Sequence, residues 1–110
     1  MKTLKFTEEL CKLIIAKKKN TTWRLFDDKN LTKEDIFILI NKNTLKEFAI
    51  GKIISIRMRT FGKLTKKDWK GHEKFSSENA MYTTYSGYYK QKVTKDTQVK
   101  VIKFKIEKII

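Results

Sequence analysis

The sequence is poor in the residue types that build disulfides, metal centres and tight turns. Its 110 residues include no proline, four glycines, one cysteine and one histidine. A single cysteine excludes an internal disulfide and a multi-cysteine zinc site, and one histidine cannot supply a histidine-rich metal site. We therefore expect neither a metal nor another cofactor.

Long apolar runs are also missing. No run approaches the roughly 18 residues that a membrane-spanning helix needs, and the lysines of the first six residues are not followed by the long apolar segment of a secretory signal peptide. We expect no membrane partner. The unpaired Cys11 fits a reducing, cytoplasmic location.

The apolar content is sufficient for one folded unit. Hydrophobic residues make up 40% of the chain and aromatic residues 12%, which is typical of a globular protein. Because a chain of this length forms one core, we expect a single domain over residues 1–110. Its oligomeric state stays open.

Positive charge dominates the sequence. Lys and Arg number 26 against 12 Asp and Glu, for a net charge of +14. Such a field attracts polyanions, above all nucleic acids, although a lysine-rich, proline-free composition is also typical of an AT-rich genome. The arginines Arg24, Arg57 and Arg59 are more informative, because a rigid guanidinium binds phosphate or carboxylate in a way that lysine cannot.

Hydrophobic patterning predicts five strands and three helices. The expected strands cover residues 1–6, 21–25, 35–41, 47–59 and 99–106. The expected helices cover residues 8–18, a short stretch between Thr65 and Gly71, and a segment from Ser76 or Ser77 to near Gly87. A loop is expected at residues 26–32. Since strands predominate and helices are inserted between them, the sequence predicts an α+β fold with a small mixed sheet closed into a barrel.

The strand patterns also predict which side chains are buried. The run from Ile36 to Ile40 is apolar on both faces, which is typical of a strand covered on both sides. In the last strand we expect Ile102 and Phe104 to point inward and Val101 outward. Gly51 predicts a bulge or bend in its strand.

One loop carries most of the candidate chemistry. It reads Lys-Lys-Lys-Asn-Thr-Thr-Trp-Arg over residues 17–24 and joins the first helix to a strand. Thr22 and Arg24 point to one side of an extended chain, and Lys19 lies just before the strand. An ammonium, a hydroxyl and a guanidinium therefore converge on one patch, although the pattern also fits a lysine-capped helix followed by an ordinary strand.

The same segment resembles the signature of the ASCH domain, a branch of the PUA-like β-barrel superfamily. That signature reads Gly-x-Lys-x-x-(Glu or Thr)-x-Arg between a helix and a strand. Lys19, Thr22 and Arg24 match its Lys, Glu/Thr and Arg positions, whereas Lys17 replaces its Gly. The resemblance extends to the segments 22–28, 68–75, 81–89 and 99–105, and so covers nearly the full chain.

The resemblance implies a PUA-like mixed β-barrel with inserted helices. ASCH domains are generally proposed to bind RNA or modified nucleosides in a cleft between the barrel and its helices. Some small members are amidohydrolases that act on N4-acetylcytidine through a Lys, a Thr and a Glu, and others have been linked to ribonuclease action. Lys19 and Thr22 match the first two of these positions. The Glu position falls on Glu73 in one register and on Lys70 in another, so catalysis stays open.

The chemistry of this set fits two functions. A threonine hydroxyl needs a base to become a nucleophile, and Lys19 is a base only if cationic neighbours or burial lower its pKa. A carboxylate at Glu73 would orient the lysine or move the proton, and Arg24 would hold an oxyanion or a phosphate. With Glu73 the set is an amide hydrolase. Without it, the same residues form a phosphate- or base-binding cleft.

Other residues are weaker candidates. His72 is a possible general base, because its unperturbed pKa is near neutrality, or an ordinary loop residue. Tyr85 and Tyr88 belong to a group of six aromatic residues within 21 positions, interleaved with lysines, as in surfaces that stack RNA bases. Their helical spacing also fits a second interpretation, in which these side chains pack against the core. The expected ligand-binding residues are Lys17, Lys19, Thr22, Arg24, His72, Tyr85 and Tyr88.

These observations predict a domain that binds RNA or a modified nucleoside in a basic cleft. Hydrolysis of an acylated cytidine by Lys19, Thr22 and Glu73 is the second prediction. A protein–protein interaction module, with a charge that reflects composition alone, is the third. Arg57 and Arg59 are phosphate contacts under the first prediction and uninvolved surface residues otherwise.

Overall fold

The computed structural model describes residues 1–26 and 29–110. Its strands are β1 (Lys2–Phe6), β2 (Thr21–Arg24), β3 (Ile36–Asn41), β4 (Glu47–Thr60) and β5 (Gln98–Ile109). Its helices are α1 (Glu8–Ile15), α2 (Lys66–Trp69) and α3 (Glu78–Tyr89), with a 3-10 turn at Phe61–Lys63. The expected order of strands and helices is confirmed. Asp27 and Asp28, which belong to the expected loop at 26–32 and to the segment 22–28 of the family resemblance, lie outside the described residues.

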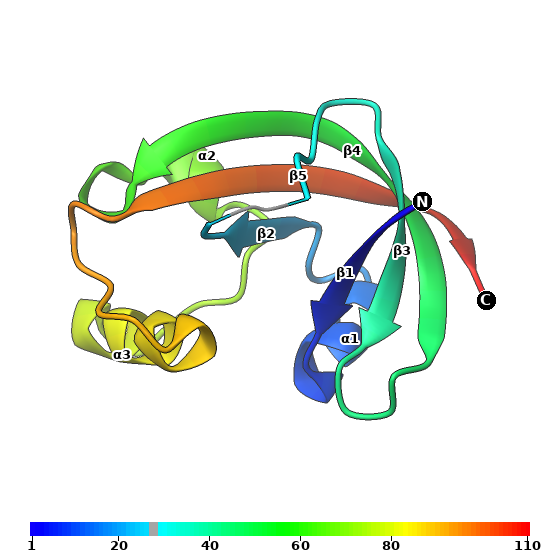
Figure 1. Ribbon diagram of the computed structural model, residues 1–110, viewed down its shortest axis with the longest axis horizontal. Coiled ribbons are helices and arrows are strands. Elements are labelled where there is room, and N and C mark those ends of the chain that lie inside the picture. The colour runs from blue at the N-terminus through cyan, green and yellow to red at the C-terminus, as the bar shows by residue number, and fades with distance from the viewer. Residues whose placement is uncertain (27–28) are drawn as a thin grey trace.

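The strands form one curled, mixed sheet in the order β1-β3-β4-β5-β2. β1 and β3 run parallel, and the other neighbours are antiparallel. The long strands β4 and β5 bend together, so the sheet closes to a half-barrel (Figure 1). The expected α+β fold with a mixed, barrel-like sheet is therefore confirmed. β1 and β2 are the two edges of this sheet, and the site described below lies between them.

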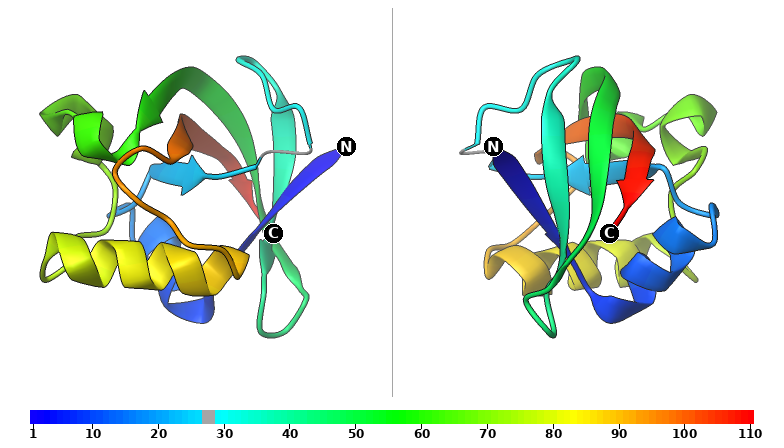
Figure 2. Two further views of the ribbon diagram at one scale, coloured as in Figure 1. Left: turned by 60° about the vertical axis from the view of Figure 1, so that its left-hand side comes forward. Right: turned by 90° about the vertical axis from the view of Figure 1, so that its right-hand side faces the viewer.

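Two apolar clusters fill the molecule. The first packs α1 into the half-barrel against β1, β3 and β4, and the second packs α3 and the Trp23 ring against the start of β5. Figure 2 shows the two helices on the same side of the sheet. β5 serves both clusters, because Ile102 and Phe104 belong to the first and Val101 to the second. The outward orientation expected for Val101 is thus wrong, since α3 covers that face.

β3 is buried on one face only, which corrects the expectation of two covered faces. Phe37 and Leu39 are fully buried, whereas Ile36 is 40% exposed. Ile36 lies on the outer surface of the half-barrel, where an apolar residue has the same sequence pattern as one in a core. The irregularity expected at Gly51 is confirmed by a register shift between Ile50 and Gly51 in the β4–β5 pairing.

The helix ends differ from expectation by a few residues. α1 ends at Ile15 and not at residue 18, because Lys17 adopts a left-handed φ of 63° and the Lys18 N–H donates to the Leu13 carbonyl. This turn sends the chain towards β2. Ser77 caps α3 as expected, but the helix continues through Gly87 to Tyr89. Among the described residues, no helix combines the length and apolar character that crossing a membrane requires.

Candidate functional site

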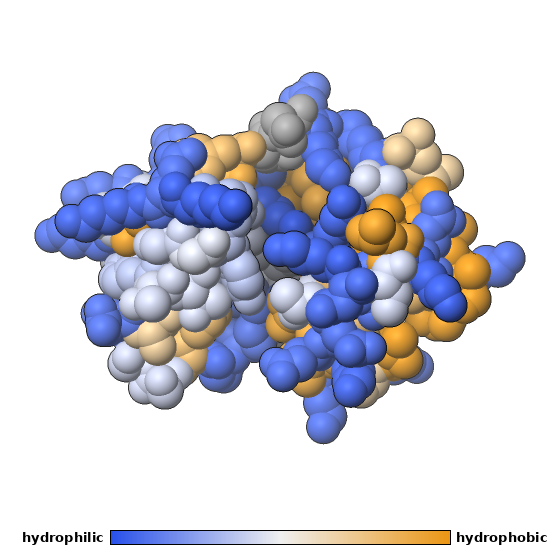
Figure 3. Space-filling model, turned by 60° about the horizontal axis from the view of Figure 1, so that its bottom comes forward, coloured by the Kyte–Doolittle hydropathy of each residue, from blue (hydrophilic) through white to orange (hydrophobic). Residues whose placement is uncertain are grey.

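A cavity of about 250 Å³ lies between the sheet edges β1 and β2 and helix α3. In Figure 3 the surface is hollowed between the pale wall formed by α3 and a strongly hydrophilic wall opposite. The lining includes six of the residues predicted from the sequence: Lys19, Thr22, Arg24, Glu73, Tyr85 and Tyr88. The separate segments that carry the predicted chemistry therefore meet in one place.

The segment that follows α2 brings Glu73 to Lys19. The Gly71 carbonyl accepts hydrogen bonds from the N–H groups of Asn20 (2.9 Å) and Thr21 (3.0 Å), and the Thr21 hydroxyl donates to the Lys70 carbonyl (2.7 Å). This contact requires a glycine, because φ at Gly71 is +80° and a Cβ atom there would lie 1.8 Å from the Asn20 side chain. Residues 70–71 are thus hydrogen-bonded to residues 20–21 at the start of β2, and Glu73 follows two residues after Gly71.

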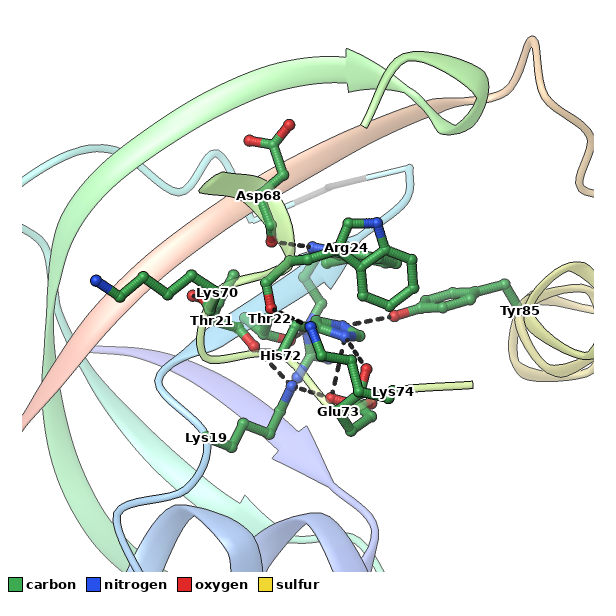
Figure 4. A network of polar contacts seen from close by, with 12 residues as sticks. Lys19, Thr21, Thr22, Arg24, Asp68, Lys70, His72, Glu73, Lys74 and Tyr85 are labelled. Atoms are coloured by element: carbon green, nitrogen blue, oxygen red, sulfur yellow. Dashed lines mark hydrogen bonds and ion pairs between the residues drawn. The ribbon is translucent and has the colours of Figure 1, made fainter. Parts of the chain in front are cut away.

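Lys19 is buried at the inner end of the cavity, with 2% of its surface exposed. Its Nζ donates to Glu73 Oε1 (2.5 Å) and to the Thr21 carbonyl (2.6 Å). Figure 4 shows the lysine and the carboxylate facing each other. Burial lowers the pKa of Lys19, Glu73 opposes that shift, and the positive charge of Arg24 adds to it. The Lys19 amino group, a donor, and the Glu73 carboxylate, an acceptor, therefore lie side by side where little solvent reaches them.

Arg24 bridges the open edge of the sheet. Its Nε donates to Thr22 Oγ1 (3.2 Å), and its Nη2 donates to the Lys5 carbonyl of β1 (2.9 Å). The guanidinium also lies 4.6 Å from the ring centroid of Phe6. Because the Thr22 oxygen accepts in this bond, its proton is directed elsewhere. A cation that donates to a hydroxyl oxygen favours the alkoxide, so Arg24 makes Thr22 more acidic.

His72 lies outside the cavity lining and is 4% exposed. Its ring stacks on Trp23 with 3.7 Å between centroids. Desolvation by burial, with a contribution from Lys19, lowers its pKa to about 2. His72 is therefore neutral, and its 3.3 Å contact with Glu73 Oε1 is not an ion pair. These observations argue against a general-base role for His72.

The tautomer of His72 follows from its partners. Nδ1 lies 2.8 Å from the Glu73 carbonyl oxygen, which can only accept, so Nδ1 carries the proton. Nε2 then accepts from the Tyr85 hydroxyl at 3.1 Å. His72 links α3 to the backbone of Glu73 and so fixes the carboxylate relative to the tyrosines of that helix.

Arg57 and Arg59 bind a buried carboxylate. Asp68 is fully buried, and its two oxygens accept from Arg57 Nε (2.8 Å) and Arg59 Nε (3.0 Å). Burial raises the pKa of Asp68, but hydrogen bonds from Thr65 and both arginines outweigh it and hold the pKa at about 2. The Asp68 carbonyl also accepts from Trp23 Nε1 (3.2 Å). The two arginines thus anchor α2 to β4, which argues against the phosphate contacts considered for them.

No protein-family model matches the sequence, and no curated protein does. Solved structures match its shape. Protein EF3133 from Enterococcus faecalis V583, of the family model DUF984, aligns with a TM-score of 0.79 at 12% identity, over 99% of this chain and 77% of its own. An ASCH domain from Lactobacillus crispatus JV V101 aligns with a TM-score of 0.66 at 14% identity, over 89% and 70%. The S128A mutant of ZmASCH from Zymomonas mobilis aligns at 0.63 and 15% identity, over 98% and 71%.

This chain has the fold of an ASCH domain. The ASCH-like fold places the segment with the signature-like residues at the cavity, and the two positions left open for the Glu are now separated in space. Glu73 contacts Lys19, whereas the side chain of Lys70 is exposed. The signature Gly is replaced by Lys17, which is exposed and outside the lining. Lys17 keeps the left-handed turn that a glycine would favour.

Several residues of the ASCH-like cavity were missed at the sequence level. They are Lys5, Phe6, Thr7, Leu10, Trp23, Lys42 and Tyr89. The inward orientation of Phe6 follows from its strand pattern, but only the sheet order reveals that β1 is an edge next to β2. Across residues 1–26 and 29–110, no group of three or more His, Cys, Asp or Glu side chains is placed to hold a metal ion.

Proposed function

We propose that residues 1–110 act as one domain that binds a modified nucleoside, free or within RNA, in the cavity between β1, β2 and α3. The observation that carries this proposal is the Lys19–Glu73 pair, buried at the inner end of a cavity whose walls are aromatic. The expected third function, a protein–protein interaction module, does not explain a buried polar pair that lines a cavity.

The cavity has the chemical character of a base-binding site. Phe6, Trp23, Tyr85, Tyr88 and Tyr89 supply aromatic surface, on which bases stack. The Lys19 ammonium donates and the Glu73 carboxylate accepts, and nucleobase edges present acceptors and donors side by side in the same way. A volume of about 250 Å³ is close to the lower end of the roughly 300–1,000 Å³ typical of small-molecule sites. One nucleoside fits this scale, and a longer stretch of RNA does not.

The placement of Glu73 also supports a second function, hydrolysis of an amide on the base. Thr22 Oγ1 would add to the carbonyl carbon while neutral Lys19 takes the hydroxyl proton and passes it to the leaving amine. Water would then cleave the acyl-threonine and restore the hydroxyl. Burial lowers the pKa of Lys19, which is the direction this role requires, and Arg24 makes the Thr22 hydroxyl more acidic.

One experiment tests both functions. The protein is titrated with the four ribonucleosides and with N4-acetylcytidine in a calorimeter, and the mixtures are then analysed for cytidine and acetate by chromatography. We expect saturable binding that Lys19→Met or Glu73→Gln weakens by about tenfold or more, since each variant removes a charged hydrogen-bonding group. The exposed Lys66→Ala variant is the control for lost positive charge and should bind as the wild type does.

The outcomes separate the two functions. Binding without product supports the binding function and contradicts the hydrolase. Cytidine formation that Thr22→Val abolishes and Thr22→Ser retains supports the hydrolase. If none of the five compounds binds, both functions are wrong. If Lys66→Ala weakens binding as much as Lys19→Met, the cavity is not the site.

A further inference from the structure

The cavity carries more positive charge than a neutral nucleoside needs. Its lining residues include four that are cationic, Lys5, Lys19, Arg24 and Lys42, and one that is acidic, Glu73. Lys19 and Glu73 neutralise each other through their ion pair. Lys5 and Lys42 add further positive charge to a mostly aromatic cavity. A ligand that matches this lining has an aromatic ring and a negative charge of its own.

The excess charge lies on one rim. Lys5 belongs to β1, and Lys42 follows the end of β3. The two strands are paired in parallel, and the Lys42 N–H donates to the Phe6 carbonyl (2.8 Å), so both lysines lie near the carboxyl end of this pair. Both are exposed. Among the described residues, neither ammonium pairs with a carboxylate.

The wall opposite Lys5 and Lys42 is formed by α3 and is aromatic. α3 (Glu78–Tyr89) contributes the tyrosines of the cavity and contains no lysine or arginine. Tyr88 is 44% exposed at this wall. Burial raises the pKa of Tyr88, and the negative charges of Glu73 and Glu9 raise it further. α3 thus brings no cation to the cavity, and an anionic group is favoured at the rim formed by Lys5 and Lys42.

We infer that the cavity takes a nucleoside that carries a phosphate, with the base among the aromatic side chains and the phosphate at Lys5 and Lys42. This inference rests on the proposed function and narrows its ligand class. The chemistry is shared by a free 5′-mononucleotide and by a nucleotide within RNA. Lys5 and Lys42 select for the phosphate, and the Lys19–Glu73 pair contacts the base.

The test compares each ribonucleoside with its 5′-monophosphate by calorimetry at low salt. We expect at least one monophosphate to bind about tenfold more tightly than its nucleoside, the gain typical of charge-assisted hydrogen bonds. The double variant Lys5→Ala/Lys42→Ala should remove this gain, so that it binds the monophosphate no more tightly than the nucleoside. Lys66→Ala/Lys108→Ala loses the same charge at exposed positions outside the cavity and should retain the gain.

Two further probes identify the source of the phosphate and the role of the base. A single-stranded hexanucleotide that binds more tightly than the monophosphate indicates RNA, and one that does not bind indicates a free nucleotide. Inorganic phosphate that competes as well as the monophosphate overturns the inference, because the base then contributes nothing. Equal affinity for nucleoside and monophosphate overturns the inference but leaves the proposed function standing. If no nucleoside and no monophosphate binds, both are overturned.

Discussion

At the scale of single residues, His72 is a structural histidine in a position that suggests catalysis. It lies between Gly71 and Glu73, where a general base would be close to the site. Its ring, however, stacks on Trp23, and both ring nitrogens have hydrogen-bond partners. Burial keeps the imidazole neutral, because its charged form would lose hydration, and the positive charge of Lys19 disfavours that form further. The residue links the Glu73 backbone to Tyr85 of α3.

The buried, neutral imidazole of His72 makes the stability of the fold depend on pH. The pKa of His72 is lowered from 6.5 to about 2 in the folded protein, so its contribution is complete above pH 6.5 and is lost as the unfolded chain takes up a proton below it. We expect the free energy of unfolding to fall by about 2 kcal/mol between pH 7 and pH 5 through this residue. Urea unfolding at pH 7, 6 and 5 measures the change.

The His72→Gln variant serves as the comparison, because glutamine does not titrate. His72 is the one histidine of the chain, so the variant should lose the slope between pH 7 and 5 while being less stable at pH 7. A variant with the same slope as the wild type would show that His72 is not the source. Lower stability at every pH with an unchanged slope would likewise contradict the neutral state.

At the scale of elements, the candidate site depends on how α2 is attached to β4. α2 is one turn long, and a helix this short is not stable alone. Asp68 holds it by two means, a capping box with Thr65 at its own N-terminus and ion pairs with Arg57 and Arg59 of β4. Since Glu73 lies five residues after Asp68, this attachment also determines where the carboxylate of the site lies.

Replacing Asp68 should therefore destabilise the fold and disturb the site. Its pKa is lowered from 3.8 to about 2, so the carboxylate stabilises the folded state above pH 3.8 and this stability is lost as the pH falls towards 2. We expect Asp68→Asn to lower the free energy of unfolding by about 2 kcal/mol at pH 7. The difference from the wild type should nearly vanish at pH 2. Urea unfolding at the two pH values measures it.

Asp96→Asn provides the control, because Asp96 is exposed and its replacement removes the same charge. It should have almost no effect at either pH. NMR shifts of His72 and Glu73 should move in Asp68→Asn and stay in place in Asp96→Asn. A stability loss in Asp68→Asn that is equally large at pH 2 would mean that packing, and not the ion pairs, holds α2.

At the scale of the whole molecule, the net charge of +14 and the charge of the cavity have different consequences. The lysines are spread over strands, helices and loops, and as a field they attract any polyanion. The cavity adds a small number of cations beside aromatic surface. Under the proposed function, the first effect would determine how strongly RNA is attracted, and the second would determine which nucleotide is held.

Salt separates these two effects. Each phosphate contact of a single strand reduces affinity roughly threefold when salt rises from 50 to 200 mM. We expect the affinity for a 5′-mononucleotide to fall by about threefold over this range, because it has one phosphate. A hexanucleotide that also contacts surface lysines should lose far more. Calorimetry at both salt concentrations measures the two slopes, and a mononucleotide as salt-sensitive as the hexanucleotide would contradict a specific site.

Some of this molecule could be predicted from sequence because the signals are local. Alternation within Lys2–Phe6, the helical stripe of α1 and the capping residues Thr65 and Ser77 depend on neighbours in the chain. The convergence of Thr22 and Arg24 follows from the two-residue period of a strand. Val101 and Ile36 were misassigned, because an apolar side chain has the same pattern whether a helix covers it or solvent does.

The sequence by itself therefore determined the order of elements, the ASCH-like signature residues Lys19, Thr22 and Arg24, and the large positive charge. The tertiary structure alone decided that Glu73 and not Lys70 meets Lys19, that His72 is neutral, and that Lys5 and Lys42 border the cavity. The physical reason is the distance along the sequence between the residues that interact. Periodicity acts over a few residues, whereas Lys19 and Glu73 are brought together across the chain by Gly71, α2 and the open edge between β1 and β2.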